Sequence, residues 1–476
     1  GANGVVVIDT KRGHSMATRI DANVSAGLTL VPKLPTMMNA SQYRNYVTEL
    51  LGTVSGIQHN NIDFKFLNDD PNGYYYHTYH NDTDWGDEVY KTSITQNYSI
   101  NVQGGDDIGM YNLSVGYVDA RYAAKKNGFN RMNVRFNTDI SILYNLKTKF
   151  DISIARTAND VFDNGMPQDF GAGTVVSPTA LALLKSPLVS PYQYIKQLGS
   201  FSSLLFDYDD LFTQITDDYS MANPLAVLSY GKGNNKNRAE NTYFNVRVEP
   251  VYEISRSLKL TAMFSYTLDR NAQRYFRPYT GVPAFNIAGV GRVRAKVQSM
   301  FAKENNFVGK LQVDWARQFG KHGVSAFAGA RYNTFTYDNN DVGVQATGQT
   351  SDKNPRLSEN GFRSILGVND EWTNIQWYAN VDYNYMQRYF ATLTLTSEAN
   401  SRFGENADGL KLFGVKWAMF PSVQLGWVLT NEEWFPKHLG INYLRVNAGF
   451  DISGNDGISN YAARTSYTTV RYNASA

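Results

Sequence analysis

The chain contains no cysteine, which excludes disulfides and thiolate metal sites. Its 476 residues carry a net charge of +2 and no long run of Lys or Arg, so nothing electrostatic favours a nucleic-acid partner. No apolar run approaches the ~20 residues that a membrane-spanning helix needs. A membrane β-barrel remains open, because barrel strands alternate in polarity and give only a weak hydropathy signal.

Catalytic fingerprints are missing as well. The sequence holds no GxSxG, Walker or dinucleotide motif, so we expect no catalytic residues and no enzyme. His77 and His80 precede an acidic stretch, but their order matches neither an HExxH motif nor an EF-hand loop, and we interpret the stretch as a solvated loop. A second acidic group contains Asp207, Asp209 and Asp210, where a structural calcium ion is the alternative to a solvated loop. We expect no other cofactor.

What the sequence does have is polarity that alternates with period two. Between Met132 and Ile142 the even positions are mainly apolar and the odd positions are polar. This pattern is typical of a strand with one apolar and one wet face. The segments Tyr111–Tyr117 and Leu146–Ile154 repeat it on either side, so we expect consecutive antiparallel hairpins. Abundant aromatics, 14% of the residues, fit strands better than helices.

The alternation recurs along the chain and predicts about thirteen strands long enough to cross a bilayer. Short turns are expected at 104–109, 144–145, 254–257, 319–322 and 386–388. Long loops are expected at 32–91, 121–129, 158–237, 271–302, 339–374 and 400–418, with a short helix at Ser41–Leu51 in the first. Short and long connections alternate, so in an up-and-down barrel all long loops share one rim, as in outer-membrane barrels.

Alternation by itself does not say which face is buried, since a soluble β-sandwich alternates too. Three features favour a barrel: the strands are long, charged residues recur on one face, and aromatics lie near strand ends. We therefore predict an all-β fold, a transmembrane antiparallel up-and-down β-barrel. Inward-facing arginines are expected to contact a plug and line the lumen: Arg19, Arg135, Arg247 and Arg445.

Aromatic residues of the predicted loops are the candidates for substrate binding, because flat rings stack on sugars or peptide side chains. The alternative is that these rings pack loop against loop. The candidates are Tyr74, Tyr75, Tyr76, Tyr79, Trp85, Tyr275, Phe276 and Tyr279.

Several segments together resemble one family. The opening Gly1–Gly13 resembles the end of the plug domain of SusC/RagA-type TonB-dependent outer-membrane transporters of Bacteroidetes. Gln96–Ala120 resembles an early barrel hairpin of that family, and Asn223–Ala226 a recurrent loop motif. Phe420–Trp427 and Leu444–Asn455 resemble later barrel strands. The similarity covers essentially the whole chain in the correct order.

The resemblance implies a domain division and a function. Residues 1–13 would end a plug domain, and 14–476 would form a partial barrel of about 13 of about 22 strands, so most of the plug and about nine strands would lie outside this chain. The implied activity is import of an oligosaccharide or peptide across the outer membrane of a Gram-negative cell. The implied partners are a SusD-like surface lipoprotein, the TonB-ExbB-ExbD complex and outer-membrane lipid.

Other functions remain open at this point. The alternatives are a stand-alone TonB-dependent receptor, a porin-like channel, and a secreted β-rich glycan-binding protein. The run Ser397–Phe403 departs from the family pattern and leaves the local loop contacts open. The residues name neither the substrate nor the oligomeric state.

Overall fold

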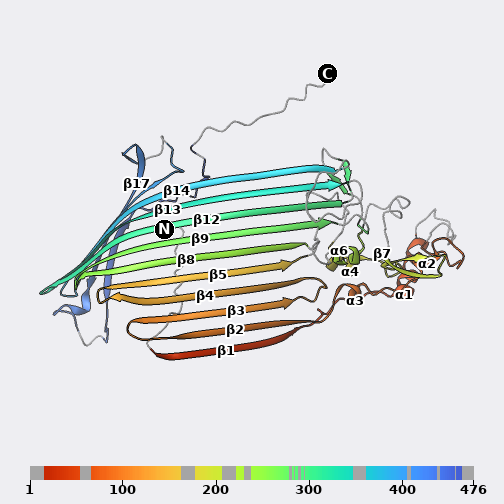
Figure 1. Cartoon of the computed structure of the whole chain (residues 1–476), viewed down its shortest axis with the longest axis horizontal. Coiled ribbons are helices and arrows are strands. Elements are labelled where there is room, and N and C mark those ends of the chain that lie inside the picture. Colours follow the sequence, from red (N-terminus) through yellow and green to blue (C-terminus); the bar gives the residue numbers. More distant parts are fainter. Residues whose placement is uncertain are drawn as a thin grey trace, which may run out of the picture.

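A single large antiparallel sheet dominates the computed structural model (Figure 1). The structure describes residues 16–53, 66–161, 177–205, 221–229, 237–277, 281–282, 285–287, 291–293, 295–346, 361–404, 409–436, 440–455, 457–461 and 463. In this part of the chain the sheet has 14 strands, and almost every strand pairs with the next long strand in sequence. The predicted all-β, up-and-down architecture is confirmed.

The strands follow one another around an arc that begins at β1 and ends at β18. They are β1 (Met16–Thr29), β2 (Ser93–Gly105), β3 (Gly109–Arg121), β4 (Gly128–Leu143), β5 (Leu146–Asp160), β8 (Arg238–Ser255), β9 (Leu258–Arg277), β12 (Ala295–Phe319), β13 (His322–Ala346), β14 (Gly361–Tyr385), β15 (Tyr389–Asn400), β16 (Leu410–Leu412), β17 (Val415–Val428) and β18 (Arg445–Asp451). Because β16 is a three-residue strand paired only with the start of β17, thirteen strands remain, as predicted.

The connections divide between two rims. The turns at 144–145 and 386–388 have the predicted bounds, and those between β2 and β3, β8 and β9, and β12 and β13 lie within the predicted ranges. In the first of these, Asp106 Oδ1 accepts hydrogen bonds from the backbone N–H groups of Ile108 and Gly109 at 2.9 Å. These bonds, the one from Gly109 foremost, lower the pKa of Asp106. We call this end of the sheet the short-turn rim.

The opposite end, the long-loop rim, carries all the helices except a short 3-10 turn (Figure 1). Its elements in the described residues are α1 (Ala40–Gly52), α2 (Tyr76–Tyr79), α3 (Trp85–Val89), α4 (Pro178–Leu184), β6 (Tyr192–Ile195), β7 (Ser200–Leu205), α6 (Pro224–Ser229), β10 (Phe285–Ile287) and β11 (Gly291–Val293). The helix expected at Ser41–Leu51 is α1. Its N-terminus has a capping box, in which Asn39 and Gln42 each accept the other's backbone N–H.

Three loops are shorter in the structure than predicted, because the strands extend farther than expected. Strand β9 continues to Arg277 and β12 begins at Ala295, both inside the loop expected at 271–302. Strands β13 and β14 likewise enter 339–374, and only 122–127 separate β3 from β4. In these extensions polar and apolar residues share one face, as Arg274 and Phe276 do on β9 and Lys303 and Phe301 on β12. The contrast in polarity that marks a strand in the sequence therefore disappears.

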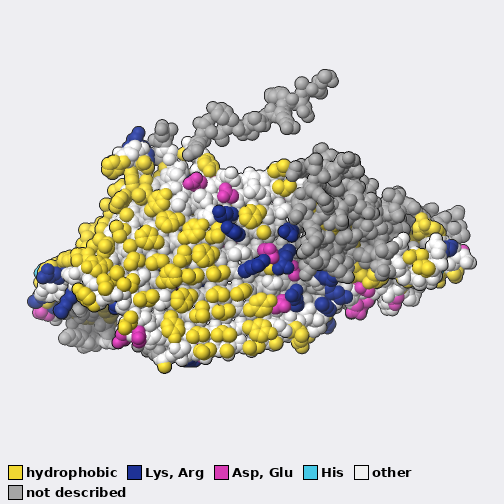
Figure 2. Space-filling view, viewed as in Figure 1, with side chains coloured by type: hydrophobic (Ala, Val, Ile, Leu, Met, Phe, Trp, Pro, Cys, Tyr) yellow, Lys and Arg dark blue, Asp and Glu magenta, His cyan; other side chains and the backbone are white. Residues whose placement is uncertain are grey.

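The apolar face of the sheet points outward and is exposed (Figure 2). Ile20 and Val24 are 66% and 73% exposed, and Trp377 is 54% exposed. The other two sheets in the described residues are two-stranded hairpins, so neither can cover this face as a sandwich partner would. So large an apolar surface is unfavourable in water but matches the hydrocarbon of a bilayer.

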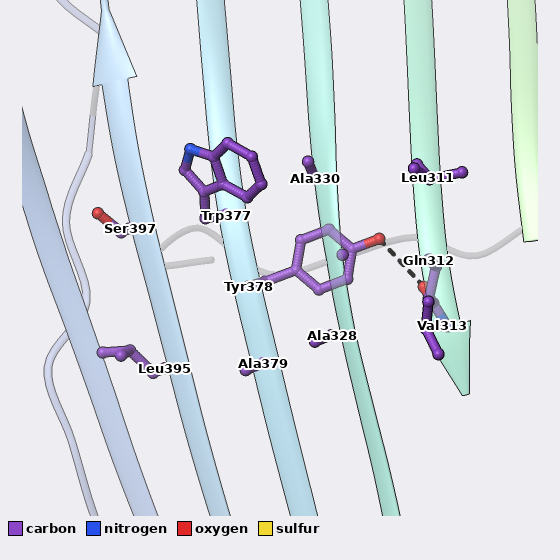
Figure 3. A pocket seen from close by; sticks show the side chains of 11 residues that line it. Leu311, Gln312, Val313, Ala328, Ala330, Trp377, Tyr378, Ala379, Leu395 and Ser397 are labelled. Atoms are coloured by element: carbon purple, nitrogen blue, oxygen red, sulfur yellow. Dashed lines mark hydrogen bonds between the residues drawn. The ribbon is translucent and has the colours of Figure 1, made fainter. Parts of the chain in front are cut away.

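Strands β12 to β14 show how neighbouring residues divide between the two faces (Figure 3). Leu311 and Trp377 border a shallow apolar hollow of about 420 Å³ on the outward face. On the other face, the Tyr378 hydroxyl donates to Gln312 Oε1 at 3.1 Å and so spans the intervening strand. Gly329 makes this crossing possible, because a Cβ there would lie 2.5 Å from the Tyr378 hydroxyl.

Aromatic rings line the short-turn rim. Tyr389 of β15 stacks on Tyr385 of β14 and on Trp427 of β17, with centroids 6.4 and 6.1 Å apart. The connection from β17 to β18 begins with a 3-10 turn (η2, Leu429–Asn431), and Glu432 beyond it accepts the Trp427 indole N–H at 3.0 Å. That bond lowers the pKa of Glu432. Rings at this level agree with the aromatic girdle expected at a membrane interface.

Candidate functional site

The long-loop rim holds the water-excluded core of the described residues. Its members come from the first and third loops of the rim, which contain α2, α3, α4 and α6, and from Val282 in the loop between β9 and β12. We call them the rim core: Tyr79, Trp85, Val89, Leu181, Ala182, Val189, Ala222, Leu225, Ala226, Leu228 and Val282. Two loops more than 90 residues apart in sequence therefore fold as one layer over the mouth of the sheet.

Hydrogen bonds between main chain and side chains join the two loops. The Thr83 hydroxyl donates to Val189 O at 2.8 Å, and the Thr83 N–H donates to Pro187 O at 2.9 Å. Asn81 Nδ2 lies within 3.1 Å of Leu188 O and also contacts two carbonyls of its own loop. These bonds satisfy buried backbone groups that would otherwise lose their partners when water is excluded.

The segment Asn223–Ala226 has a structural role. Asn223 is fully buried, and its Nδ2 donates to Pro191 O at 2.8 Å while its Oδ1 accepts the Leu225 N–H at 3.0 Å. Pro224 follows as the first residue of α6, where a proline needs no N–H partner. Through Asn223 this motif connects α6 to the residue before β6.

Two of the predicted binding residues belong to the rim core. Trp85 is 3% exposed, and its indole N–H donates to Ser186 O at 2.9 Å. Tyr79 is buried, and this burial raises the pKa of its hydroxyl to about 12. Both rings therefore pack loop against loop, the alternative that the sequence left open, and neither presents a face to a ligand in this structure.

Other predicted rings form a partly exposed group with His77 and His80, which in the sequence were weighed only as metal ligands, and with Tyr194 and Phe201, which the sequence did not single out. Tyr76 stacks on His80 with centroids 3.9 Å apart, and His77 stacks on Tyr194 at 3.8 Å. Phe201 packs edge-on against Tyr194 at 5.3 Å. We call Tyr74, Tyr75, Tyr76, His77, His80, Tyr194 and Phe201 the distal aromatic cluster; it joins α2 to the hairpin β6–β7.

Exposure varies within the distal aromatic cluster. Tyr74 is 85% exposed and packs edge-on against Tyr75, which in turn contacts the rim core. Arg44 of α1 supports the base of the cluster by donating to Phe66 O at 2.9 Å and to Tyr79 O at 3.0 Å. The cluster thus combines exposed ring faces with a rigid base, an arrangement suited to stacking on a ring or planar group.

The remaining predicted site residues are dispersed. Tyr275 is half-buried on β9 with Lys296 Nζ 5.5 Å from its ring centroid, and Phe276 is buried. Tyr279 lies outside the described residues, as do Asp207, Asp209 and Asp210. Their proposed roles therefore stay predictions.

The acidic stretch after His80 makes structural contacts. Asp82 Oδ1 accepts the Ala40 N–H at 2.8 Å, and Asp84 caps α3 by accepting the Gly86 N–H at 2.8 Å. His80 Nε2 lies 3.0 Å from Asp69 Oδ1. In the described part of the chain, no three His, Asp or Glu side chains gather as metal ligands would.

The inward face of the sheet is polar and internally bonded. Arg247 pairs with Glu249, which also lies 3.7 Å from Lys149 Nζ. Arg19 pairs with Asp21 at 2.8 Å, and Arg445 lies 4.6 Å from the ring centroid of Phe390. The arginines expected to face the lumen do so. Whether they contact a plug stays a prediction, because residues 1–13 lie outside the described part.

Known proteins resemble the chain over almost its full length. TonB-dependent receptor P3 of Formosa agariphila is 22% identical over 475 residues, which are 99% of this chain and 42% of that protein. TonB-dependent receptor SusC of Bacteroides thetaiotaomicron is 22% identical over 470 residues, 96% of this chain and 41% of SusC. The resemblance to SusC/RagA-type receptors is confirmed. No protein-family model matches this chain.

Solved structures agree on the fold. The RagAB peptide importer in its closed-closed state superposes with a TM-score of 0.70 at 19% identity and covers 100% of this chain and 51% of its own. The chain therefore spans about two-fifths of these curated relatives and about half of the RagAB importer chain. With its outward apolar face, it is part of an outer-membrane barrel. Among the described residues no helix is both long and apolar enough to cross a membrane. The relatives are named receptors, in agreement with the expectation that the chain is not an enzyme.

Proposed function

We propose that this chain is the barrel part of an importer that carries a nutrient across the outer membrane with energy delivered through TonB. The observation that carries the proposal is its correspondence, from end to end, to receptors named TonB-dependent. An apolar outward face, a polar inner face and long loops folded over one rim are what such a barrel requires. No chemical step on the cargo is involved; the coupled event is conformational.

The cargo in this proposal is an oligosaccharide or a peptide, captured with the help of a SusD-like surface lipoprotein at the long-loop rim. One relative is SusC, and the solved neighbours are described as a peptide importer. Residues 1–13 would end the plug that the TonB-ExbB-ExbD complex displaces. Aromatic faces at the rim support capture there, because they bind sugar rings and peptide side chains equally well.

Deleting one rim loop in the full-length protein tests this proposal. Val161 N–H donates to Asn237 O at 3.0 Å, so a short turn can replace residues 162–236 without moving β5 or β8. We expect cargo uptake and lipoprotein capture to be lost, because seven of the eleven rim-core residues are removed, while heat-modifiable migration persists. Normal uptake by this variant would refute the proposal.

A matched control shortens another loop on the same rim. Ala346 and Gly361 are cross-strand partners, so a short turn can likewise replace 347–360. None of the eleven residues named as the rim core lies in this segment, and we expect the control to keep more capture than the first deletion.

The exposed rings of the distal aromatic cluster are the part of this proposal that concerns the binding site. Replacing Tyr74 and Tyr76 together by Ala should weaken cargo or lipoprotein capture about tenfold, since each stacked ring contributes roughly 0.5–1.5 kcal/mol. Replacing the buried Tyr79 by Phe, which keeps the ring, is the control. Unchanged capture by the first variant would remove these rings from the site.

A pull-down from detergent-solubilised outer membranes tests the proposal against two alternatives, a stand-alone TonB-dependent receptor and a porin-like channel. A stoichiometric surface lipoprotein supports the proposal, whereas a barrel recovered by itself favours a stand-alone TonB-dependent receptor or a porin-like channel. Uptake that persists without TonB would favour the channel. The exposed apolar face argues against a secreted glycan-binding protein.

A further inference from the structure

A cluster of cations lies on the outward face, just beyond the apolar band toward the long-loop rim (Figure 2). On β9, Arg270 is the next outward residue after Leu268, and on β12 Lys303 follows Phe307 and Asn305. Strand register places Arg270 directly opposite Lys303. Both point to the same side as the exposed Leu311 and therefore toward the surroundings of the barrel.

A second cationic pair adjoins the first. Arg274 on β9 lies two residues from Arg270 on the same face and is directly opposite Arg238 on β8. Like charges placed opposite each other on one face of an antiparallel pair are destabilising. Arg238 is paired with Glu240 and Asp160, whereas Arg270, Arg274 and Lys303 keep their charges available to an external anion. We call Arg238, Arg270, Arg274 and Lys303 the cationic strip.

The acidic residues around the cationic strip are already engaged or too distant. Glu240 lies 2.9 Å from Arg238 and 3.5 Å from Arg156, and Asp160 lies 3.4 Å from Arg238. Asp338 is directly opposite Lys303 in register, but the two side chains make no ion pair within 4 Å. Arg270, Arg274 and Lys303 make no ion pair with any described residue.

The position of the cationic strip decides what kind of anion it meets. From Lys303 to Arg317, the next outward charge on β12, the strand advances 14 residues, or about 46 Å at ~3.3 Å per residue. At the ~35–45° tilt of outer-membrane strands this is roughly 35 Å along the membrane normal, enough for the apolar band and one headgroup layer. Long loops mark the outer leaflet, so the cationic strip lies at its headgroup level.

We propose that the cationic strip binds the phosphate groups of an outer-leaflet glycolipid headgroup. Arg guanidinium groups pair with phosphate through two parallel hydrogen bonds, and Lys adds a point charge. Basic residues beside a bilayer attract anionic headgroups in this way. Phe301 is exposed on the outward face of β12, at the level between Lys303 and Arg274. It provides an apolar contact within the same patch. The bound lipid anchors the barrel at the base of the long-loop rim.

Lipid binding by the full-length protein in detergent tests the proposal. Phosphorylated lipid A is titrated against wild type, R270S/K303S and R256S/R317S, and bound lipid is counted by native mass spectrometry. The control variant removes two exposed cations from the short-turn side of the same strands. We expect R270S/K303S to bind about 30-fold more weakly, from two basic side chains near the surface, and the control to bind like wild type.

Two further titrations identify the ligand group. Lipid A stripped of its phosphates should bind wild type and R270S/K303S equally weakly, and inorganic phosphate should not displace the lipid at matched concentrations. Equal binding by both double variants, tight binding of the stripped lipid, or displacement by inorganic phosphate would each overturn the proposal. Unchanged heat-modifiable migration of both variants shows that the barrel itself is intact.

Discussion

The sheet exposes the same kinds of apolar residue that the rim core buries. On the sheet, Trp377 and Val24 point outward and are more than half exposed, whereas Trp85 and Leu181 in the rim core are almost completely buried. The hydrogen bonds differ as well: strands satisfy their backbones by pairing, while the rim loops need side chains such as Asn81 and Asn223.

The difference shows that each region is built for its own solvent. In a bilayer an apolar side chain gains little by turning inward, because lipid tails are as apolar as a protein core. Above the membrane water drives the same side chain inside. Four predictions test this difference between the sheet and the rim core, in order of decreasing expected effect.

The same truncation should have unequal effects in the two regions. Replacing Trp85 by Ala should destabilise the rim layer by about 3–5 kcal/mol, because it opens a cavity and leaves Ser186 O without its donor. Replacing Trp377 by Ala should have a much smaller effect, since lipid fills the space. Hydrogen exchange in the full-length protein measures the loss of protection in both variants. Equal losses would contradict the different environments assigned to Trp85 and Trp377.

A buried charge distinguishes the two faces of one strand. Replacing Leu311 by Arg places a cation on the outward face near the middle of the band, and we expect a loss of about 2–4 kcal/mol. The control is Val308→Arg, on the inward face of the same strand, which should cost little. Urea unfolding in lipid vesicles gives both values, and similar shifts would contradict the assignment of the faces.

One glycine tests the packing between strands. In Gly329→Ala the new Cβ would lie 2.5 Å from the Tyr378 hydroxyl and 2.6 Å from Leu311 O, and we expect a loss of about 1–3 kcal/mol. Gly309→Ala is the matched control, because its Cβ would meet only Phe307 at 3.6 Å. The urea midpoints of the two variants should separate; coincidence would mean that the Tyr378 crossing is not constrained.

The rim layer should also respond to pH. Lys185 Nζ lies 5.6 Å from the Trp85 ring centroid, and burial lowers the pKa of Lys185 to about 7. The unfolded loop, with an ordinary lysine pKa near ~10.4, then binds more protons, so stability rises between about pH 7 and pH 10 and the full cost of burying the charge is present below that window.

Substituting Lys185 by Met should remove this rise and stabilise the layer most at pH 6. Limited proteolysis of the wild-type and variant full-length proteins at pH 6 and pH 9 measures the effect. A wild-type layer that is equally resistant at both values would show that the ammonium group is solvated.

The strand count and the short turns were predictable from the sequence, because each depends on local alternation. The outward direction of the apolar face also needed the length of the strands, the recurrence of charge on one face and the placement of aromatics. The outward set on β4 is visible in Met132–Ile142 itself. Loop ends were not predictable at the long-loop rim, as at Arg277, because the alternation is lost there: Arg274 shares the outward face of β9 with Phe276. The burial of the predicted binding rings was not predictable either. Tyr76 and Tyr79 are three residues apart in sequence, but only Tyr79 packs against α3 and α6.

The sequence by itself determined the class of protein, since period-two alternation and the placement of short and long connections depend only on local residue order. The tertiary structure decided which aromatics are buried, that His77 meets Tyr194, and that Arg270 faces Lys303. Each of these depends on segments far apart in the chain, whose relative positions are set by strand register and loop packing and leave no mark on the local sequence.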